Sequence, residues 1–275
     1  MVAAARNMPI GKQFGASRRT SFEVTRSVWT ALLLRESLTR LFSSRGAWFW
    51  LLAEPSFHIA YMMVIFTVVR IRHIGGIATA AWIMIGVLSF MAFRRTASQS
   101  MQAVNSNHAL FTYRQVKPID AVLTRALLEG VLVVVVTLTV MAAAVFFGVD
   151  AVPDDPITVM AVFLGMWLLG IGFATTMSIV VELAPEFGKL VNFVMTPLYF
   201  ISGVIFPIAS VPPPYREWVM LNPLAHGVEG ARKAFAAHYH GAPETDIPYI
   251  YGFALVLIVL GLALHRVFAH KLVTR

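Results

Sequence analysis

The sequence contains no cysteine, and only 13% of its residues are charged. The missing cysteine excludes disulfides, thiolate metal sites and thiol nucleophiles. The scarcity of charge excludes an ordinary soluble domain, in which about a quarter of the residues are charged. Apolar residues are abundant instead, since the hydrophobic fraction is 58% and the mean hydropathy is +0.72. One core of a 275-residue chain cannot hide that much apolar surface, so the composition predicts a polytopic membrane protein.

Signals for nucleotide binding and secretion are also missing. The pairs Gly11-Lys12 and Gly188-Lys189 lack the Ser or Thr that follows the lysine of a phosphate-binding loop, and the spaced glycine before it. If ATP is used, we expect a partner protein to hydrolyse it. Residues 1–21 are basic but contain no apolar run like that of a signal peptide. We interpret them as a cytoplasmic tail and expect the first spanning helix to target the chain.

Six apolar segments predict membrane-spanning helices. A hydrocarbon core of roughly 30 Å requires about 20 apolar residues in a helix. Segments of this kind lie at residues 47–69, 74–93, 126–147, 157–181, 190–209 and 249–269. The sequence therefore predicts an all-α membrane protein, with residues 47–272 forming one transmembrane domain.

The basic residues predict the orientation of these spans. With the N-terminus and C-terminus both inside, 17 of the 22 Lys and Arg residues lie on the inner side. Such a bias is typical of cytoplasmic segments, so we expect an N-in/C-in topology. The net charge of +8 would suggest nucleic acid in a soluble protein. Because the basic residues here precede and separate apolar runs, we expect anionic lipid headgroups rather than nucleic acid as their partner.

Two segments outside the predicted spans have a different pattern of apolar residues, one before the first span and one between the fifth and the sixth. In residues 22–46, Leu34, Leu38 and Leu41 recur at a spacing of three or four, with charged residues on the other side. This spacing favours an amphipathic helix lying in the cytoplasmic interface, and the alternative is a soluble helix packed on a partner. Residues 210–248 are rich in proline and have no apolar run long enough to cross. We expect partial, re-entrant helices there, on the outer side.

Few ionisable residues lie within the predicted spans. Glu129 follows Arg125 by one helical turn, so the sequence predicts a structural i,i+4 ion pair rather than an ion-coupling site. Glu54, which precedes Pro55, either faces a wet cavity or caps a neighbouring helix. The histidines of residues 210–248 lack the spacing of metal ligands, and no bound metal is expected.

The second-to-third connection, residues 94–120, combines apolar and basic side chains. A merely solvated basic loop would not need its apolar members, whereas aromatic and basic anchors are typical of protein interfaces. We therefore favour a docking helix at this connection. Its candidate contact residues are Leu110, Phe111, Tyr113, Arg114 and Lys117.

Aromatic residues are concentrated in the first and fifth predicted spans. Rings in membrane helices usually contact lipid or pack against other helices, but their flat faces also suit sugars if the helices line a path. The candidates for such a path are Phe57, Tyr61, Phe66, Tyr199, Phe200 and Phe206. The sequence leaves both interpretations open.

Several stretches together resemble type-2 ABC transporter permeases, in particular the branch that exports capsular polysaccharide. They are LLRESLTR at residues 33–40, WFWLLAEP at 48–55, LFTYRQVKP at 110–118, SGVIFP at 202–207 and NPLAH at 222–226, followed by Val228, Glu229 and Arg232. The resemblance begins near Leu33 and runs to the end of the chain. The stretch at 110–118 resembles the capsule branch specifically.

The resemblance implies a homodimer in the bacterial inner membrane, with two cytoplasmic ATPase subunits that bind ATP and Mg while this chain binds no cofactor. It also implies a periplasmic adaptor, an outer-membrane pore and a lipid-linked acidic polysaccharide as substrate. The connection at 94–120 would insert into the ATPase, and the first and fifth spans would line the channel. Arg35 and Arg40 would receive a phosphate-bearing lipid head or would only anchor their helix.

Other functions are weighed against this one. One alternative is a permease of the same architecture that transports O-antigen, teichoic acid or a small hydrophobic drug. An ion-coupled secondary carrier is disfavoured by the scarcity of acidic residues in the spans. A membrane scaffold without transport activity is the last alternative.

Overall fold

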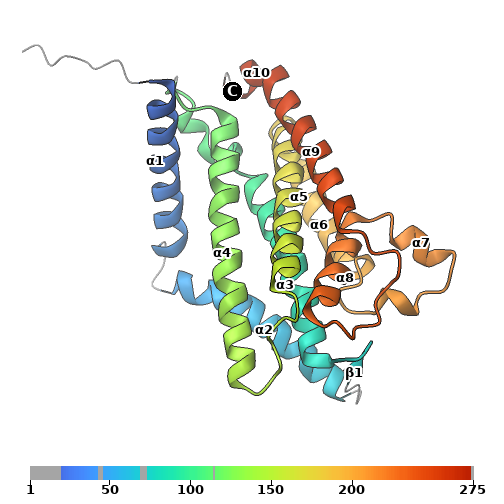
Figure 1. Cartoon of the computed structure of the whole chain (residues 1–275). Coiled ribbons are helices and arrows are strands. Elements are labelled where there is room, and N and C mark those ends of the chain that lie inside the picture. The colour runs from blue at the N-terminus through green and yellow to red at the C-terminus, as the bar shows by residue number, and fades with distance from the viewer. Residues whose placement is uncertain (1–19, 43–45, 69–72, 114, 274–275) are drawn as a thin grey trace, which may run out of the picture.

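The computed structural model of the chain describes residues 20–42, 46–68, 73–113 and 115–273. Nearly all of the predicted basic tail, and Arg114 of the predicted docking loop, therefore lie outside the described residues. The described chain is predominantly helical, as predicted (Figure 1).

The helices and strands are as follows. The α-helices are α1 (Ser21–Phe42), α2 (Ala47–Val68), α3 (Thr79–Ser100), α4 (Pro118–Phe146), α5 (Pro156–Leu183), α6 (Glu186–Ile201), α7 (Tyr215–Val219), α8 (Pro223–Phe235), α9 (Ile247–Val267) and α10 (Ala269–Val273). The 3₁₀-helices are η1 (Asn105–Leu110) and η2 (Ile208–Ser210). The short strands β1 (His73–Ile74) and β2 (Ile77–Ala78) pair antiparallel, with Ile74 opposite Ile77.

Four helices among the described residues are long and apolar enough to cross a membrane, namely α3, α4, α5 and α9. Proline lies in the first turn of α4, α5 and α9, where its fixed φ angle suits helix initiation and its missing N–H is not needed. The segment predicted to cross at 74–93 instead begins with the β1–β2 hairpin. The hairpin turns at Gly75 and Gly76, whose φ angles are 59° and 96°, so α3 begins only at Thr79 and extends to Ser100.

The first predicted span at 47–69 agrees with α2 to within one residue, whereas the fifth has a different extent in the structure. Helix α6 covers Glu186–Ile201, 16 residues, and at about 1.5 Å per residue it is shorter than a hydrocarbon core of roughly 30 Å. It ends before the predicted boundary at residue 209 because Gly203 has a φ angle of 73°, which a helix does not allow.

Helix α3 lies at the centre of the bundle. Its residues from Ala81 to Phe90 are all buried, and α3 packs against α2, α4, α5 and α8, while α5 also packs extensively on α9. A Cβ atom added to Gly172 on α5 would come within 2.9 Å of the Ala254 carbonyl on α9. Small residues at this interface therefore let the two backbones approach closely, as is common between membrane helices.

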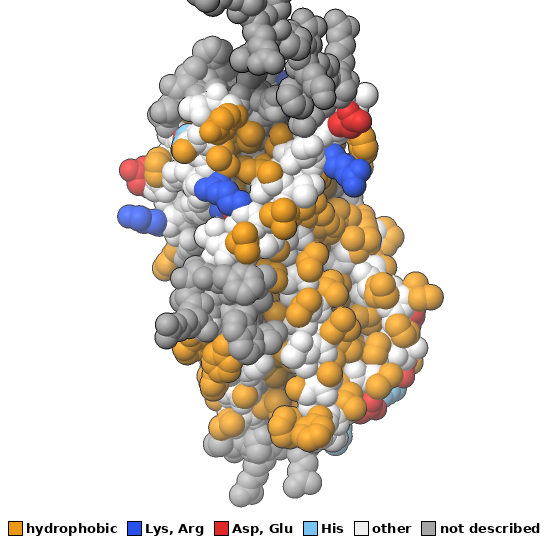
Figure 2. All heavy atoms as spheres, turned by 90° about the vertical axis from the view of Figure 1, so that its left-hand side faces the viewer, with side chains coloured by type: hydrophobic (Ala, Val, Ile, Leu, Met, Phe, Trp, Pro, Cys, Tyr) orange, Lys and Arg blue, Asp and Glu red, His pale blue; other side chains and the backbone are white. Residues whose placement is uncertain are grey.

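The bundle has two distinct ends (Figure 1). Helix α1 begins, η1 lies and α10 ends at one end, which we call the loop end. The β1–β2 hairpin and the turn between α4 and α5 lie toward the other, which we call the hairpin end. On the face that carries α1 and α4, hydrophobic side chains cover much of the visible surface, and the visible Lys and Arg side chains lie in its upper half, toward the loop end (Figure 2).

Candidate functional site

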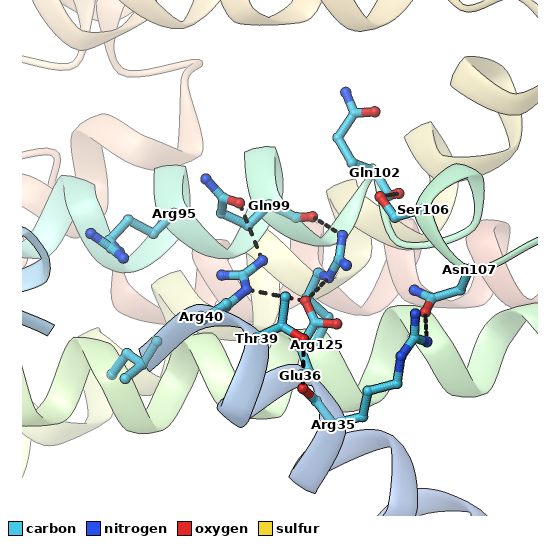
Figure 3. Close-up of a pocket in the computed structure, with 11 residues that line it drawn as sticks. Arg35, Glu36, Thr39, Arg40, Arg95, Gln99, Gln102, Ser106, Asn107 and Arg125 are labelled. Carbon is cyan, nitrogen blue, oxygen red and sulfur yellow. Dashed lines mark hydrogen bonds and ion pairs between the residues drawn. The ribbon is translucent and has the colours of Figure 1, made fainter. Parts of the chain in front are cut away.

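A cavity of about 640 Å³ opens at the loop end between α1, α3 and α4. Most of the side chains that line it are polar (Figure 3). They are Arg35, Glu36, Thr39, Arg40, Arg95, Gln99, Gln102, Ser106, Asn107, Arg125 and Leu132. Its wall therefore carries more arginine than carboxylate, which makes the cavity basic. We call it the arginine cavity.

Each wall of the arginine cavity comes from one face of a helix. On α1, Glu36 and Arg40 are one turn apart, and their side chains form an ion pair of 3.1 Å. On α3, Arg95 and Gln99 are four residues apart, so they lie on one side of the helix, and Gln102 follows in the turn after it. Helical periodicity thus places the lining residues on one face of each helix. Only the packing of α1 against α3 and α4 brings these faces together.

Ion pairs across these helices hold the cavity in place. Glu36 on α1 lies 2.6 Å from Nε of Arg125 on α4. Glu129, which is fully buried, pairs with Arg40 on α1 and, at 3.3 Å, with Arg95 on α3. These cross-helix pairs correct the predicted Arg125–Glu129 pair within α4. The i,i+4 spacing permits that pair, but the arginines and glutamate of the neighbouring helices take both partners instead.

Neutral side chains orient the remaining donors. Arg35 donates to the side-chain oxygen of Asn107 at 2.6 Å, and Arg40 donates to that of Gln99 at 3.2 Å. Arg125 reaches the backbone carbonyl of Gln99 at 3.4 Å. Figure 3 shows the Arg40 and Arg125 side chains on either side of Glu36. The guanidinium groups of Arg40 and Arg125 thus lie close together around Glu36, whereas that of Arg35 lies beside Asn107 (Figure 3).

Glu36 is the carboxylate that lines the cavity itself. Burial alone would raise the pKa of Glu36, but the ion pair with Arg125 and the charge of Arg40 outweigh it and lower the pKa below its usual value. Glu36 is therefore ionised at neutral pH.

Helix α1 turns its polar side toward the bundle. Leu34 and Leu38 on the opposite side are 60% and 59% exposed, and Trp29 donates to Asp120 of α4 at 3.0 Å. Arg35 and Arg40, the predicted contacts for a lipid headgroup, line the arginine cavity. This arrangement leaves the leucines free to contact the acyl region while the arginines stay in a polar space.

The structure brings only some of the aromatic path candidates together. His58 of α2 shares a hydrogen bond of 2.8 Å between its Nε2 and the hydroxyl of Tyr199 on α6. The His58 ring also meets the rings of Tyr61 and Tyr199, with both centroid distances 5.6 Å. Tyr61 is 51% exposed and Phe200 45%, whereas Tyr199 is buried. Tyr199 therefore positions its neighbours rather than offering a free face.

The other path candidates lie apart from this group. Phe57 is exposed on α2, and Phe66 packs against the main core. Phe206 lies beyond the end of α6, in a small cluster with Ile208 and Met220. The structure thus joins the candidates of α2 and α6 at one point, through a histidine that sequence reasoning did not select. His58 gave no sequence signal because a single histidine in an apolar helix has no characteristic spacing.

The predicted docking residues differ in their exposure to solvent. Tyr113 is 65% exposed, Lys117 is exposed and Leu110 is half-buried. Phe111 is only 3% exposed and packs in a cluster that includes Val104 and Val122. The interpretation of Phe111 as a surface anchor is therefore wrong, because this ring holds the connection onto the bundle.

Sequence reasoning also missed lining residues of the arginine cavity. Arg95 and Gln99 belong to the last turns of α3, which the hydropathy pattern placed in a loop after residue 93. Asn107 belongs to η1. The four-residue spacing of Arg95 and Gln99 along a continued helix was the available signal. At the hairpin end, His226 bonds to the Met220 carbonyl at 2.6 Å and accepts from the Asp246 backbone at 2.9 Å, so it serves structure there.

A bundle of long apolar helices with a basic cavity at one end is the architecture of a membrane transport subunit. Residues 27–236 match the ABC-2 type transporter family, and the chain belongs to this family.

Similar proteins include transport proteins of several bacteria. The polysialic acid transport protein KpsM of Escherichia coli is 32% identical over 90% of this chain and 96% of its own length. The capsule polysaccharide export inner-membrane protein CtrC of Neisseria meningitidis is 28% identical over 88% of this chain and 91% of its own. The corresponding protein BexB of Haemophilus influenzae is 24% identical over 91% and 94%.

Proposed function

We propose that this chain is the permease subunit of an ATP-driven exporter that moves lipid-anchored capsular polysaccharide across the bacterial inner membrane. The observation that carries the proposal is similarity along almost the whole chain to proteins named for polysialic acid transport and capsule polysaccharide export. The chain itself is a transmembrane transporter subunit, and ATP hydrolysis belongs to a partner.

The proposed topology has six spans with both termini in the cytoplasm. It is supported by the common position of the start of α1 and the end of α10 at the loop end (Figure 1), and by the arginines that gather there. Helices α2 and α6 supply the first and fifth spans in this proposal. Helices α7 and α8 are the partial helices on the outer side.

The connection between α3 and α4 is the proposed contact with the ATPase. Tyr113 and Lys117 are exposed there, while Phe111 fastens the connection to the core cluster that also contains Leu272 near the C-terminus. A displacement of the exposed residues by the ATPase would be transmitted through the buried Phe111 to the helices, because packed elements move as rigid bodies. Two ATPase subunits on a permease homodimer would act on two such connections.

The arginine cavity is the proposed site for the anionic head of the lipid anchor. Arg35 and Arg40 enter it from the interfacial helix α1, where an anchor in the inner leaflet would first meet the protein. The exposed rings of Tyr61 and Phe200 are the proposed contacts for sugar residues beyond it. A periplasmic adaptor and an outer-membrane pore would receive the polymer.

Inside-out vesicles test the proposed division of labour. The chain is reconstituted with its partner ATPase, and the uptake of a lipid-linked acidic polysaccharide and the hydrolysis of ATP are measured. We expect uptake only when both subunits and ATP are present. ATP hydrolysis by the chain alone, or uptake driven by an ion gradient without the ATPase, would overturn the proposal. The control is a partner ATPase whose phosphate-binding lysine is replaced.

A further inference from the structure

Arg232 is fully buried in the middle of α8, at the hairpin end. Its guanidinium donates to the backbone carbonyls of Gly203 and Val204, both at 2.8 Å. It also donates to the carbonyl of Trp82 on α3 at 3.3 Å and lies 3.5 Å from the centroid of the Trp82 ring. One side chain thus contacts α3, α8 and the residues that follow α6.

Glu229, one turn earlier on α8, balances this charge. It lies 3.2 Å from the Arg232 guanidinium and accepts from the backbone N–H of Ala242 at 3.2 Å. The hydroxyl of Tyr239 lies 3.1 Å from both carboxylate oxygens of Glu229 and accepts from the Trp82 indole at 3.2 Å. Burial raises the pKa of Tyr239 to about 12, so its hydroxyl keeps its proton and donates to the carboxylate.

Glycines leave room for these two charged groups. A Cβ atom on Gly86 of α3 would collide with the Arg232 guanidinium. A Cβ atom on Gly241 would come within 2.7 Å of the Glu229 carboxylate. Any larger side chain at either position would therefore displace one member of the ion pair.

The geometry explains why arginine is needed here. The carbonyls of Gly203 and Val204 belong to the irregular segment that follows α6, where the backbone has no helical hydrogen-bond partners and needs donors from elsewhere. A planar guanidinium with five donors reaches two such carbonyls, a third on α3 and a carboxylate together, which the single ammonium of lysine cannot reproduce. Arg232 therefore holds the segment that follows α6 from a different helix.

We propose that Arg232 is a positioning residue that joins α8, the end of α6 and α3 into one rigid block at the outer side of the permease. Helix α6 carries Tyr199 and Phe200 in its last turn, just before the segment that Arg232 holds. The block makes the outer ends of the three helices move together, so a displacement produced at the loop end reaches the outer side undiminished. The export part of this inference rests on the proposed function, whereas the rigid block does not.

The chain lacks cysteine, so spin labels at two introduced cysteines report the block directly. Ile201→Cys at the end of α6 and Ala237→Cys just after α8 are both exposed positions. In the complex with the ATPase, we expect one narrow distance distribution with and without trapped ATP. Arg232→Gln and Arg232→Lys should each broaden it. Arg216→Gln is the matched control, because Arg216 pairs with Glu244 at 2.8 Å outside this block and should leave the distribution unchanged.

A second readout separates positioning from mere stability. At equal amounts of assembled complex, Arg232→Gln should raise the ATP hydrolysed per polymer exported several-fold, whereas Arg216→Gln should not change it. If Arg232→Gln keeps the narrow distribution and the native ratio, the proposal is wrong.

Tyr239→Phe is the variant to measure if Arg232→Gln fails to assemble with the ATPase. It removes one hydroxyl between Glu229 and Trp82 but leaves the Arg232 ion pair, so we expect a smaller broadening in the same direction. An unchanged distribution in this variant would likewise overturn the proposal. If the labels behave as expected but the native complex exports no polysaccharide, the proposed substrate fails and the rigid block stands.

Discussion

Clusters of arginine and glutamate lie at both ends of the bundle, and they differ in how completely the charges are satisfied. At the hairpin end, Arg232 and Glu229 are fully buried, and protein groups surround both of them. At the loop end, Arg35, Glu36 and Arg40 line a cavity of about 640 Å³. The closed cluster has no place for a ligand and holds helices together, whereas the open cluster has donors that face a space.

The difference follows from the ratio of charges and from solvent access. A buried ion pair is tolerated only when hydrogen bonds satisfy both partners, because the desolvation cost is large. At the loop end, arginines outnumber the carboxylates around the cavity, and this excess of positive charge is stable only where water or an anion reaches it. Arginine and glutamate therefore hold helices together at the hairpin end, whereas at the loop end they favour the binding of an anion.

The largest effect is expected from breaking the closed cluster. Glu229→Gln leaves the Arg232 charge buried without its counter-charge, which typically costs about 3–5 kcal/mol of unfolding free energy. The matched variant Glu244→Gln removes the partner of Arg216, a more exposed pair, and should cost less than about 1 kcal/mol. Denaturant unfolding in detergent measures both. Equal losses would show that the two pairs do not differ as described.

A similar contrast is expected within the α3–α4 connection. Phe111→Ala removes a buried ring and should lower the unfolding free energy by about 3 kcal/mol. Tyr113→Ala should leave stability nearly unchanged but weaken binding of the partner ATPase. Thermal unfolding and co-purification of the ATPase distinguish the two variants. A stable Phe111→Ala protein that loses its ATPase would restore Phe111 as a surface anchor.

A smaller effect is expected from reducing the charge of the open cluster. Arg35→Gln should weaken binding to phosphatidylglycerol vesicles by about 1 kcal/mol, or roughly fivefold, because one cation near the headgroups is lost. Binding to phosphatidylcholine vesicles should stay unchanged. Arg26→Gln changes an arginine of α1 that does not line the cavity and should have less effect. Equal effects of the two variants would mean that the whole helix, not the cavity, attracts the lipid.

The smallest effect concerns pH. Because the folded-state pKa of Glu36 lies below its ordinary value, its ion pair with Arg125 stabilises α1 docking above that ordinary value. The contribution is lost as the pH falls through the lowered pKa. The protection of the amides in residues 21–42 against hydrogen exchange, relative to the intrinsic exchange rate at each pH, should therefore fall on acidification. Glu36→Gln should show part of this loss of protection already at neutral pH and a weaker dependence on pH, and an identical pH profile would exclude Glu36 as the cause.

Much of the helical architecture follows from hydropathy and helix signals along the chain. The start of α5 at Pro156 and of α9 at Ile247 lie within two residues of the predicted boundaries at 157 and 249, because apolar runs with proline in the first turn are local signals. The boundaries of α3 and α6 differ from prediction where Gly75, Gly76 and Gly203 adopt positive φ angles. Hydropathy does not detect such turns, because glycine in a helix and glycine in a turn have the same polarity.

The sequence alone determined the class of the protein, since so many apolar residues and so few charges require a lipid environment. It also determined where most of the long helices lie and that arginine gathers before and between them. The tertiary structure decided the partners, because ion pairing depends on which helices are neighbours. Thus Glu129 meets Arg40 and Arg95 rather than Arg125, and Arg232 binds the carbonyls of a segment that precedes it by about thirty residues in the chain.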